Sequence, residues 1–299
     1  MNASPAQPTL RRLRGADDLD LVADEWGDPD QPPVLLLHGG GQNRHAWIAT
    51  ASKLVDAGFY VLSVDARGHG DSEWDTQARY DMDDMGRDVH ALLELFDTPP
   101  AVVGASMGGM AAITAQGQAG ARQLWSSVTL VDVTPRVEID GAARIVAFMT
   151  ANPNGFDDLA QAAGVISAYN PHRPASTRTD GLRRVLRQSE DGRWRWRWDP
   201  KFMSSKAEVM LGPRHGAEAR MQDMATRLLA AAANIAVPTL LVRGGLSDLV
   251  SDDTVAEFKG AVPHAEFVDV SHAGHMVAGD DNDAFAAAII AFLRATLSD

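Results

Sequence analysis

A short apolar segment that ends in a Gly-x-Ser-x-Gly motif is the feature that most constrains this chain. Residues 101–104 suit a buried strand, residues 104–108 form the motif around Ser106, and a small, alanine-rich helical pattern follows. Glycines two positions before and two positions after a serine let a strand and a helix pass each other closely in a sharp, strained turn. Such a turn leaves the hydroxyl of Ser106 exposed at its tip, where it is placed to attack a carbonyl carbon.

Strand and helix patterns alternate on both sides of this motif. Short apolar runs bounded by Gly, Asp or Pro predict strands at residues 19–26, 34–37, 60–64, 101–104 and 128–133. The spacing of apolar residues predicts helices at residues 47–57, 83–97 and 107–117. Because strands that alternate with helices pack as a mostly parallel sheet with both faces covered, we expect an α/β fold.

The alternation stops after Thr134 and resumes near residue 239. Between these points the pattern is helical, at residues 142–150, 156–169, 182–188 and 217–233. Strands are expected again at residues 239–244 and 266–270, with helices near residues 253–259 and 283–297. We therefore predict a core of residues 1–133 and 235–299, with a helical cap of residues 134–234 inserted into it.

Composition excludes several classes of protein. The 299 residues include no cysteine, which rules out disulfides, thiolate zinc sites and a cysteine nucleophile. The net charge of -13 disfavours nucleic acids and anionic membranes as partners, because both require basic surfaces. No apolar run approaches the roughly 20 residues that cross a bilayer, and residues 1–10 lack the apolar region of a secretory signal. We expect an intracellular, cytoplasmic protein.

Arginines gather between residues 173 and 197 of this otherwise acidic chain. Most of them suit a solvated face with local salt bridges, while one or two could meet an anionic substrate. Trp194, Trp196 and Trp198 alternate with arginines, so an extended segment would place the three rings on one face. These tryptophans either pack the cap or, with Phe148 and Met149, line an apolar substrate pocket beneath it.

Serine is a weak nucleophile, so Ser106 needs a nearby base and a group that orients that base. His275 lies between the last predicted strand and the last predicted helix, on a loop at the edge of the sheet where such folds gather their chemistry. His272 lies on the same loop and is the competing base. The orienting carboxylate is expected from Asp248, just beyond the strand that resumes the alternation. The alternative acid is Asp132, at the end of the strand that follows the serine.

Attack by a serine on a carbonyl creates an oxyanion, which needs preorganised hydrogen-bond donors. The backbone N–H of Met107 opens the helix after the serine and is one expected donor. The second is expected from the glycines after strand 34–37, with Gly40 as first choice and Gly41 as second, since glycines let backbone amides approach a ligand closely. His38 is expected to stabilise this loop. No metal-ligand spacing is present, so no metal site is predicted.

Taken together, these motifs resemble the α/β-hydrolase fold family, and most of all its serine esterase and non-haem haloperoxidase-like members. The resemblance is carried by residues 38–41, 65–72, 104–109, 245–248 and 274–276, which follow the family's order and span nearly the whole chain. It implies an eight-stranded sheet, a helical cap after the sixth strand and no cofactor. It also implies a structural turn at residues 65–72, so Arg67 and His69 receive no catalytic role. Several relatives carry the acid after the sixth strand, which keeps Asp132 open.

The predicted function is hydrolysis of a carboxylic ester or lactone of a small, largely apolar substrate. A serine in place of an aspartate at the turn argues against haloalkane dehalogenases and the related epoxide hydrolases. Two alternatives stay open. One is a carbon–carbon bond hydrolase that acts on a dienol-ketone from aromatic degradation and uses a cation from the arginine stretch. The other is a non-catalytic binder of a small ligand. The expected partner is a small-molecule ester or lactone, with neither nucleic acid nor membrane, and a homodimer is left open.

Overall fold

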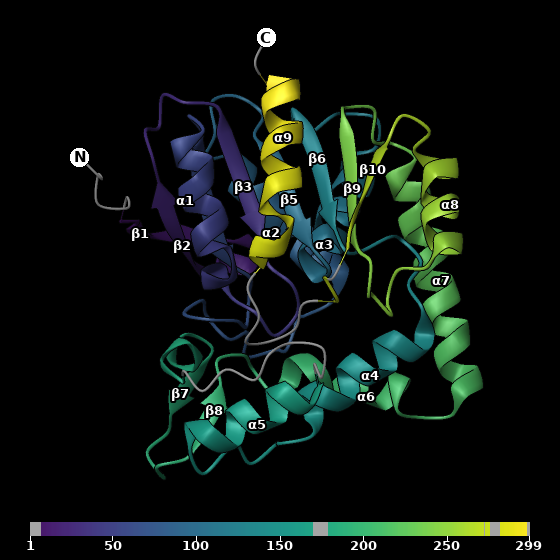
Figure 1. The fold of residues 1–299 in the computed structure, drawn as a ribbon. Helices are drawn as coiled ribbons and strands as arrows, with labels where there is room; N and C mark the ends of the chain where they lie inside the picture. Colours follow the sequence, from purple (N-terminus) through teal and green to yellow (C-terminus); the bar gives the residue numbers. More distant parts are fainter. Residues whose placement is uncertain (1–6, 170–178, 272, 276–281, 298–299) are drawn as a thin grey trace.

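The computed structural model describes residues 7–169, 179–271, 273–275 and 282–297, and its centre is a twisted sheet of eight strands in the order β1-β2-β4-β3-β5-β6-β9-β10 (Figure 1). The pairs β1–β2 and β2–β4 are antiparallel and every other neighbouring pair is parallel, which confirms the predicted mostly parallel sheet. The strands are β1 (Thr9–Arg14), β2 (Asp20–Trp26), β3 (Pro33–Leu37), β4 (Tyr60–Asp65), β5 (Ala101–Ala105), β6 (Ser127–Val131), β9 (Thr239–Gly244) and β10 (Glu266–Val270).

The central strands are buried along their whole length because helices cover both faces of the sheet. All five residues of β5 and all five residues of β6 are buried, as expected for parallel strands between two helical layers. Helices on the two sides are α1 (Ile48–Asp56), α2 (Met82–Leu93), α3 (Met107–Ala119), α8 (Asp252–Ala261) and α9 (Ala286–Leu297). Short 3-10 helices follow β1, β3 and β10, at Ala16–Asp18, Arg44–Trp47 and Asn282–Phe285.

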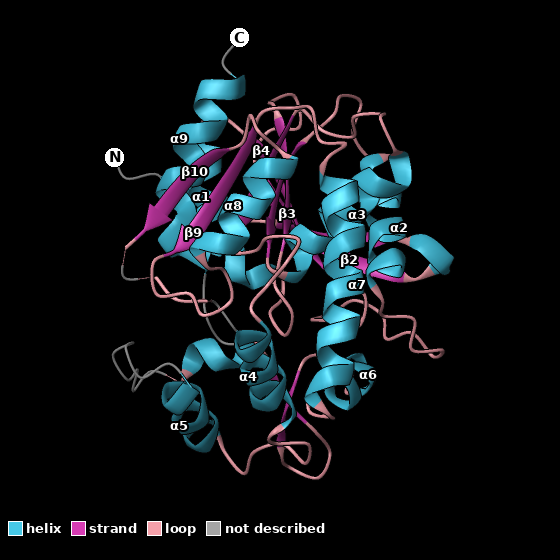
Figure 2. Ribbon diagram, turned by 90° about the vertical axis from the view of Figure 1, so that its right-hand side faces the viewer, coloured by secondary structure: helices cyan, strands magenta, loops and turns pink. Residues whose placement is uncertain are grey.

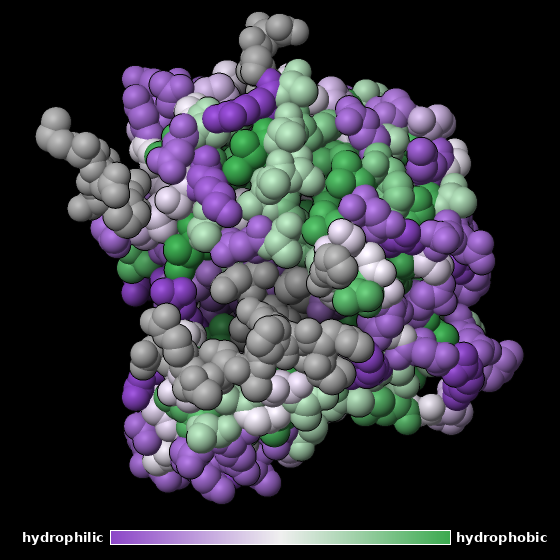
Figure 3. All heavy atoms as spheres, viewed as in Figure 1, coloured by the Kyte–Doolittle hydropathy of each residue, from purple (hydrophilic) through white to green (hydrophobic). Residues whose placement is uncertain are grey.

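One apolar core lies on each side of the sheet. Val103 of β5 belongs to the core under α1 and α9, whereas its neighbour Val102 belongs to the core under α2 and α3. On α9, Ala286, Ile289 and Leu293 are buried, so one stripe at helical spacing faces the strands. The opposite side of α9 lies on the surface, where Figure 3 shows apolar residues along the helix on the face viewed.

Between β6 and β9 the chain forms a separate layer, which Figure 1 shows below the sheet and which we call the insert (residues 134–234). It contains α4 (Ile139–Thr150), α5 (Leu159–Tyr169), a 3-10 helix (Asp180–Arg184), β7 (Leu186–Gln188), β8 (Trp194–Trp196), α6 (Lys201–Met210) and α7 (Arg214–Ala232). The division of the chain at residues 134 and 234 stays a prediction. Helix α7 belongs to both layers, because it runs beside α3 of the core and reaches down to the level of α6 (Figure 2).

The structure contradicts one local prediction and contains two elements that the sequence analysis did not predict. The helix expected at residues 182–188 is wrong, because β7 pairs antiparallel with β8 through Leu186 and Trp196, a partner that local spacing does not show. Strand β1 was not predicted, because it is an edge strand with five of its six residues exposed and so lacks an apolar run. Helix α6 was also not predicted, since its apolar residues face a cavity as well as the protein core.

Of the helices in the described part of the chain, none has the length and apolar character needed to span a membrane.

Candidate active site

Ser106 occupies the sharp turn between β5 and α3. Its backbone has φ 45° and ψ -111°, a left-handed conformation that costs energy for a residue with a side chain. The turn depends on its glycines, because a Cβ on Gly104 would lie 2.6 Å from the Gly109 backbone and a Cβ on Gly108 would lie 2.5 Å from the Leu37 carbonyl. The strand and the helix therefore cross in close contact and hold the serine at the tip, as the motif predicts.

His275 is held by a buried carboxylate. Its Nδ1–H donates to Oδ2 of Asp132 at 2.7 Å, and only 4% and 3% of the two side chains are exposed. The Asp132 carboxylate also accepts hydrogen bonds from the Gly244 N–H (2.9 Å) and the Ser247 hydroxyl (2.9 Å). With Nδ1 donating to the carboxylate, Nε2 of His275 is left as the ring nitrogen that can accept a proton.

Asp248 does not reach this histidine. Its Oδ2 forms a salt bridge with Arg144 of the insert at 2.8 Å, and 31% of its side chain is exposed. The prediction that Asp248 orients His275 is therefore corrected, and the alternative, Asp132, holds that position. Sequence spacing could not decide between them, because both acids follow neighbouring strands that end at the same edge of the sheet. The competing base, His272, lies outside the described residues.

Strand order explains why these side chains meet. Ser106 follows β5, Asp132 follows β6, Ser247 follows β9 and His275 follows β10, and these strands are consecutive neighbours in the sheet. The backbone N–H of Ser106 donates to the carbonyl of Val131, the residue just before Asp132, at 3.0 Å. Four adjacent carboxyl ends thus form one row of functional side chains. Sequence analysis missed Ser247, although it directly precedes the acid that was singled out.

The glycine loop after β3 leaves one amide facing the site. The Gly39 N–H donates to Oε1 of Gln42 at 2.9 Å, and the Gly41 N–H donates to Nε2 of His69 at 3.2 Å. The prediction of Gly41 as the second-choice oxyanion donor is therefore corrected, because its N–H is already hydrogen-bonded to His69. Gly40 lines the same cavity as Ser106, and no described residue accepts a hydrogen bond from the N–H of Gly40 or Met107. These two amides are free to meet an oxyanion.

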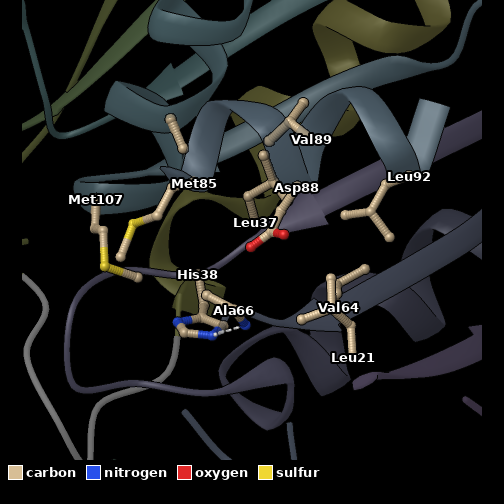
Figure 4. A pocket seen from close by; sticks show the side chains of 12 residues that line it. Leu21, Leu37, His38, Val64, Ala66, Met85, Asp88, Val89, Leu92 and Met107 are labelled. Atoms are coloured by element: carbon tan, nitrogen blue, oxygen red, sulfur yellow. Dashed lines mark hydrogen bonds between the residues drawn. The ribbon is translucent and has the colours of Figure 1, made fainter. Parts of the chain in front are cut away.

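Two other histidines near the site stabilise its loops. Nε2 of His38 accepts from the Ala66 N–H at 3.0 Å (Figure 4), and its Nδ1–H donates to the Gly39 carbonyl at 2.8 Å. Burial lowers the pKa of His38 to about 4 and the pKa of His69 to about 3, so both rings are neutral at pH 7. The cavity beside His38 in Figure 4 measures only about 30 Å³, enough for a water molecule but not for a substrate.

The turn at residues 65–72 also has a structural role, as the resemblance implied. Arg67 is fully buried and its Nε lies 2.6 Å from the Asp88 carboxylate. The Gly70 N–H donates to the Arg197 carbonyl at 2.7 Å, and the Arg197 guanidinium pairs with Asp71 at 2.7 Å. This turn therefore ties the core to the insert, and Arg197, from the arginine stretch, contributes to the tie.

The large cavity between the core and the insert has a volume of about 720 Å³ and is lined by Ser106, Gly40, Met107 and His275 together. Its wall is rich in methionine: eight of the eleven methionines in the chain line it. They come from α2, α3, α4, α6 and α7 and are Met82, Met107, Met110, Met149, Met203, Met210, Met221 and Met224. Methionine is flexible and polarizable, so such a wall adapts to apolar groups of different shapes.

The predicted aromatic pocket is corrected, except at Met149. Met149 lines the large cavity, whereas Trp194, Trp196, Trp198 and Phe148 do not. Trp196 and Trp198 stack on each other with ring centroids 4.7 Å apart, and Phe148 packs 6.1 Å from Trp196. Trp196 and Trp198 border a separate cavity of about 160 Å³. The tryptophans thus serve mainly to pack the insert, which was the other of the two interpretations.

Similarity to known proteins agrees with the observed fold. The family model described as the alpha/beta hydrolase fold matches residues 32–281. The chain is 31% identical over 267 residues to the esterase Rv0045c of Mycobacterium tuberculosis, covering 87% of this chain and 82% of that esterase. It is 26% identical over 289 residues to the 3-hydroxybutyrate-oligomer hydrolase of Cupriavidus necator, covering 92% of this chain and 93% of that enzyme. The crystal structure of an alpha/beta hydrolase from Novosphingobium aromaticivorans matches with a TM-score of 0.76 and 25% identity, over 97% of this chain and 99% of that chain.

Within the part of the chain that the structure describes, no group of three or more His, Asp or Glu side chains could hold a metal ion.

Proposed function

The chain belongs to the α/β-hydrolase fold family, and from this premise we propose that it is a serine hydrolase that cleaves a carboxylic ester or lactone with a largely apolar acyl group. Relatives that are esterases and hydrolases support a hydrolase of the esterase type. One observation carries the proposal: the hydrogen bond from His275 to Asp132, at the cavity that Ser106 also lines.

The proposed mechanism has two halves that use the same groups. Ser106 attacks the carbonyl carbon while Nε2 of His275 takes the hydroxyl proton, and Asp132 stabilises the resulting imidazolium. The N–H groups of Met107 and Gly40 stabilise the negative charge on the tetrahedral oxygen. His275 then gives the proton to the departing alcohol oxygen, and an acyl-enzyme on Ser106 remains. Water attacks this ester with His275 as base, which releases the acid and restores the serine.

The cavity wall supports an apolar acyl group. Methionine side chains from five helices line the cavity that Ser106 also lines, and Val137, Ile145 and Leu249 add further apolar surface. A lactone carries the same reacting carbonyl inside a ring, so the same groups would open it. The wall therefore suits esters and lactones whose acyl part is carbon-rich.

The two alternatives from the sequence receive less support. A carbon–carbon bond hydrolase was expected to use an arginine from residues 173–197. None of the described arginines of this stretch lines the cavity, and Arg193 and Arg195 pair with Asp157 and Asp191 near the surface. A non-catalytic binder would not need a buried carboxylate on the imidazole, because that arrangement serves proton transfer.

Covalent labelling separates an enzyme from a binder. A fluorophosphonate should modify the protein once, and peptide mass mapping should place the adduct on Ser106. A panel of p-nitrophenyl and alkyl esters with acyl chains of increasing length, together with lactones of matched size, should then be hydrolysed with an optimum set by the cavity. Absence of both labelling and ester turnover would refute the proposal.

A further inference from the structure

Lys206 of α6 is a cation on the wall of the cavity that the proposed mechanism does not use. Its Nζ donates to the Phe202 carbonyl at 3.1 Å and to the Tyr80 carbonyl at 3.4 Å. The same ammonium group lies 3.9 Å from the centroid of the Phe202 ring. An ammonium group has three N–H donors, and among the described residues only these two oxygens accept from Nζ of Lys206.

Among the described residues, no carboxylate lies within salt-bridge distance of Nζ of Lys206, although Asp81 and Asp84 line the same cavity. Arg79, another cation on this wall, differs in this respect, because it pairs with Asp75 at 2.6 Å and with Asp17 at 3.0 Å. Burial lowers the pKa of Lys206 to about 8, and the more distant Asp81 offsets this only in part. A charge that is partly removed from water without a counter-ion is a cost that a bound anion would relieve.

Lys206 lies close to the reaction centre. A Cβ placed on Gly40 would be 3.7 Å from Cζ of Phe202, and Lys206 lies over that same ring. One phenyl ring therefore separates the proposed oxyanion donor from the ammonium group. A substrate with its carbonyl oxygen at Gly40 would bring an anionic group to Lys206 a few covalent bonds further along its acyl chain.

We propose that Lys206 binds a carboxylate on the acyl part of the substrate, so that the preferred substrates are half-esters of dicarboxylic acids, or lactones that carry a free carboxylate. This inference rests on the proposed hydrolase function and narrows its substrate class. A single N–H donor suits a singly charged carboxylate better than a phosphate, which carries more charge and needs more donors. The methionines then surround the carbon chain between the carboxylate and the ester.

A binding experiment tests this without relying on turnover. Monomethyl and dimethyl esters of succinic, glutaric and adipic acid are titrated calorimetrically into Ser106→Ala protein, with and without Lys206→Met. We expect at least one monomethyl ester to bind roughly tenfold to a hundredfold more tightly than its dimethyl partner, as a hydrogen bond to a charged group predicts. Lys206→Met should remove this preference, and Lys206→Arg should retain most of it.

A second lysine provides the control for charge alone. Lys201 is the first residue of α6, is exposed, and also borders the cavity. Lys201→Met removes the same charge from the same helix, and the preference for the monomethyl ester should survive it. Equal binding of the two esters to the Ser106→Ala protein, or an equal loss for both esters in Lys206→Met, would overturn the proposal and leave Lys206 a structural tie to Tyr80.

Kinetic measurements on the protein that retains Ser106 distinguish failure of the carboxylate site from failure of the proposed hydrolase function. With Lys206→Met, KM for the monomethyl ester should rise roughly tenfold or more, while kcat/KM for the dimethyl ester changes less than about threefold. If the protein hydrolyses dimethyl esters but shows no preference for monomethyl esters, the carboxylate site is wrong and the hydrolase stands. If it binds the monomethyl ester through Lys206 but hydrolyses neither ester, the hydrolase proposal fails and the carboxylate site stands.

Discussion

The two walls of the cavity are built from different chemistry. On the core side, Asp132 and His275 are buried and hydrogen-bonded, and the glycine loop beside them is held by neutral histidines. On the insert side, the wall is mostly apolar and includes five methionines, with Lys206 lacking an acidic partner among the described residues. The core wall can hold reacting atoms in one geometry, whereas the insert wall can adapt to what enters. Changes to the core should therefore lower kcat, and changes to the insert should alter substrate choice.

The largest loss of kcat is expected when Ser106, the proposed nucleophile on the core wall, is replaced. Ser106→Ala removes the attacking oxygen, so kcat for a p-nitrophenyl ester should fall by roughly four to six orders of magnitude while the fold is kept. Steady-state kinetics and circular dichroism together measure this. Ester hydrolysis at the original rate in the alanine variant would show that another residue carries the reaction.

The next effect distinguishes the two aspartates. Asp132→Asn should lower kcat roughly a thousandfold to ten-thousandfold, because an amide cannot hold the imidazole in the required tautomer or stabilise its charged form. Asp248→Asn loses only a partly exposed salt bridge to Arg144, and its kcat should stay within about twofold of the original. The opposite ranking of the two variants would return Asp248 to the role that the sequence suggested.

A smaller loss of kcat is expected when Ser247, which donates a hydrogen bond to the Asp132 carboxylate, is replaced. Ser247→Ala removes one of the three hydrogen bonds that the Asp132 carboxylate accepts from described residues. The expected result is a fall in kcat of about tenfold with KM nearly unchanged, since the lost contact positions the histidine but does not touch substrate. A change confined to KM would mean that Ser247 acts on the substrate instead.

On the insert wall, pH should change substrate choice. Lys206 has a pKa lowered to about 8 by burial, so it is protonated below this value and neutral above it. The ratio of kcat/KM for a monomethyl ester to that for its dimethyl partner should fall as pH rises through about 8 to 9, and any group that affects both esters equally cancels in this ratio. Of the neighbours with a shifted pKa, His69 is already neutral in this range, and the pKa of Tyr80 is raised by burial. A ratio that stays constant from pH 6 to 10 would contradict the role of Lys206.

The smallest effect is expected for the methionines of the insert. Met221→Leu and Met224→Leu keep volume and apolar character, so kcat should stay within about twofold of the original. The less flexible side chain should narrow the range of acyl groups, with KM rising about twofold to threefold for branched chains. Measuring KM over a series of linear and branched acyl esters tests this. A loss of kcat comparable to that in Ser247→Ala would show that the insert shares in positioning the catalytic groups.

Much of the core could be predicted because its signals are local. Gly104 is required by a close contact with the backbone of Gly109, five residues further along the chain, and the buried strands β3, β5 and β6 are short runs rich in apolar residues. The insert was harder to predict. Leu186 lies in a strand that pairs with the strand of Trp196, a partner that local spacing does not show. The arginines of residues 173–197 form separate ion pairs with acids that are distant in the sequence, such as Arg193 with Asp157 and Arg197 with Asp71.

The sequence by itself pointed to the α/β fold and to Ser106, His275, Met107 and Gly40 as candidate site residues, because each of these residues lies in a segment that follows a strand. Only the tertiary structure decided between Asp132 and Asp248 and revealed the methionine wall with Lys206. These depend on which strand ends are neighbours and on which faces of separate helices converge, and such distances are set by packing across the chain rather than by spacing along it.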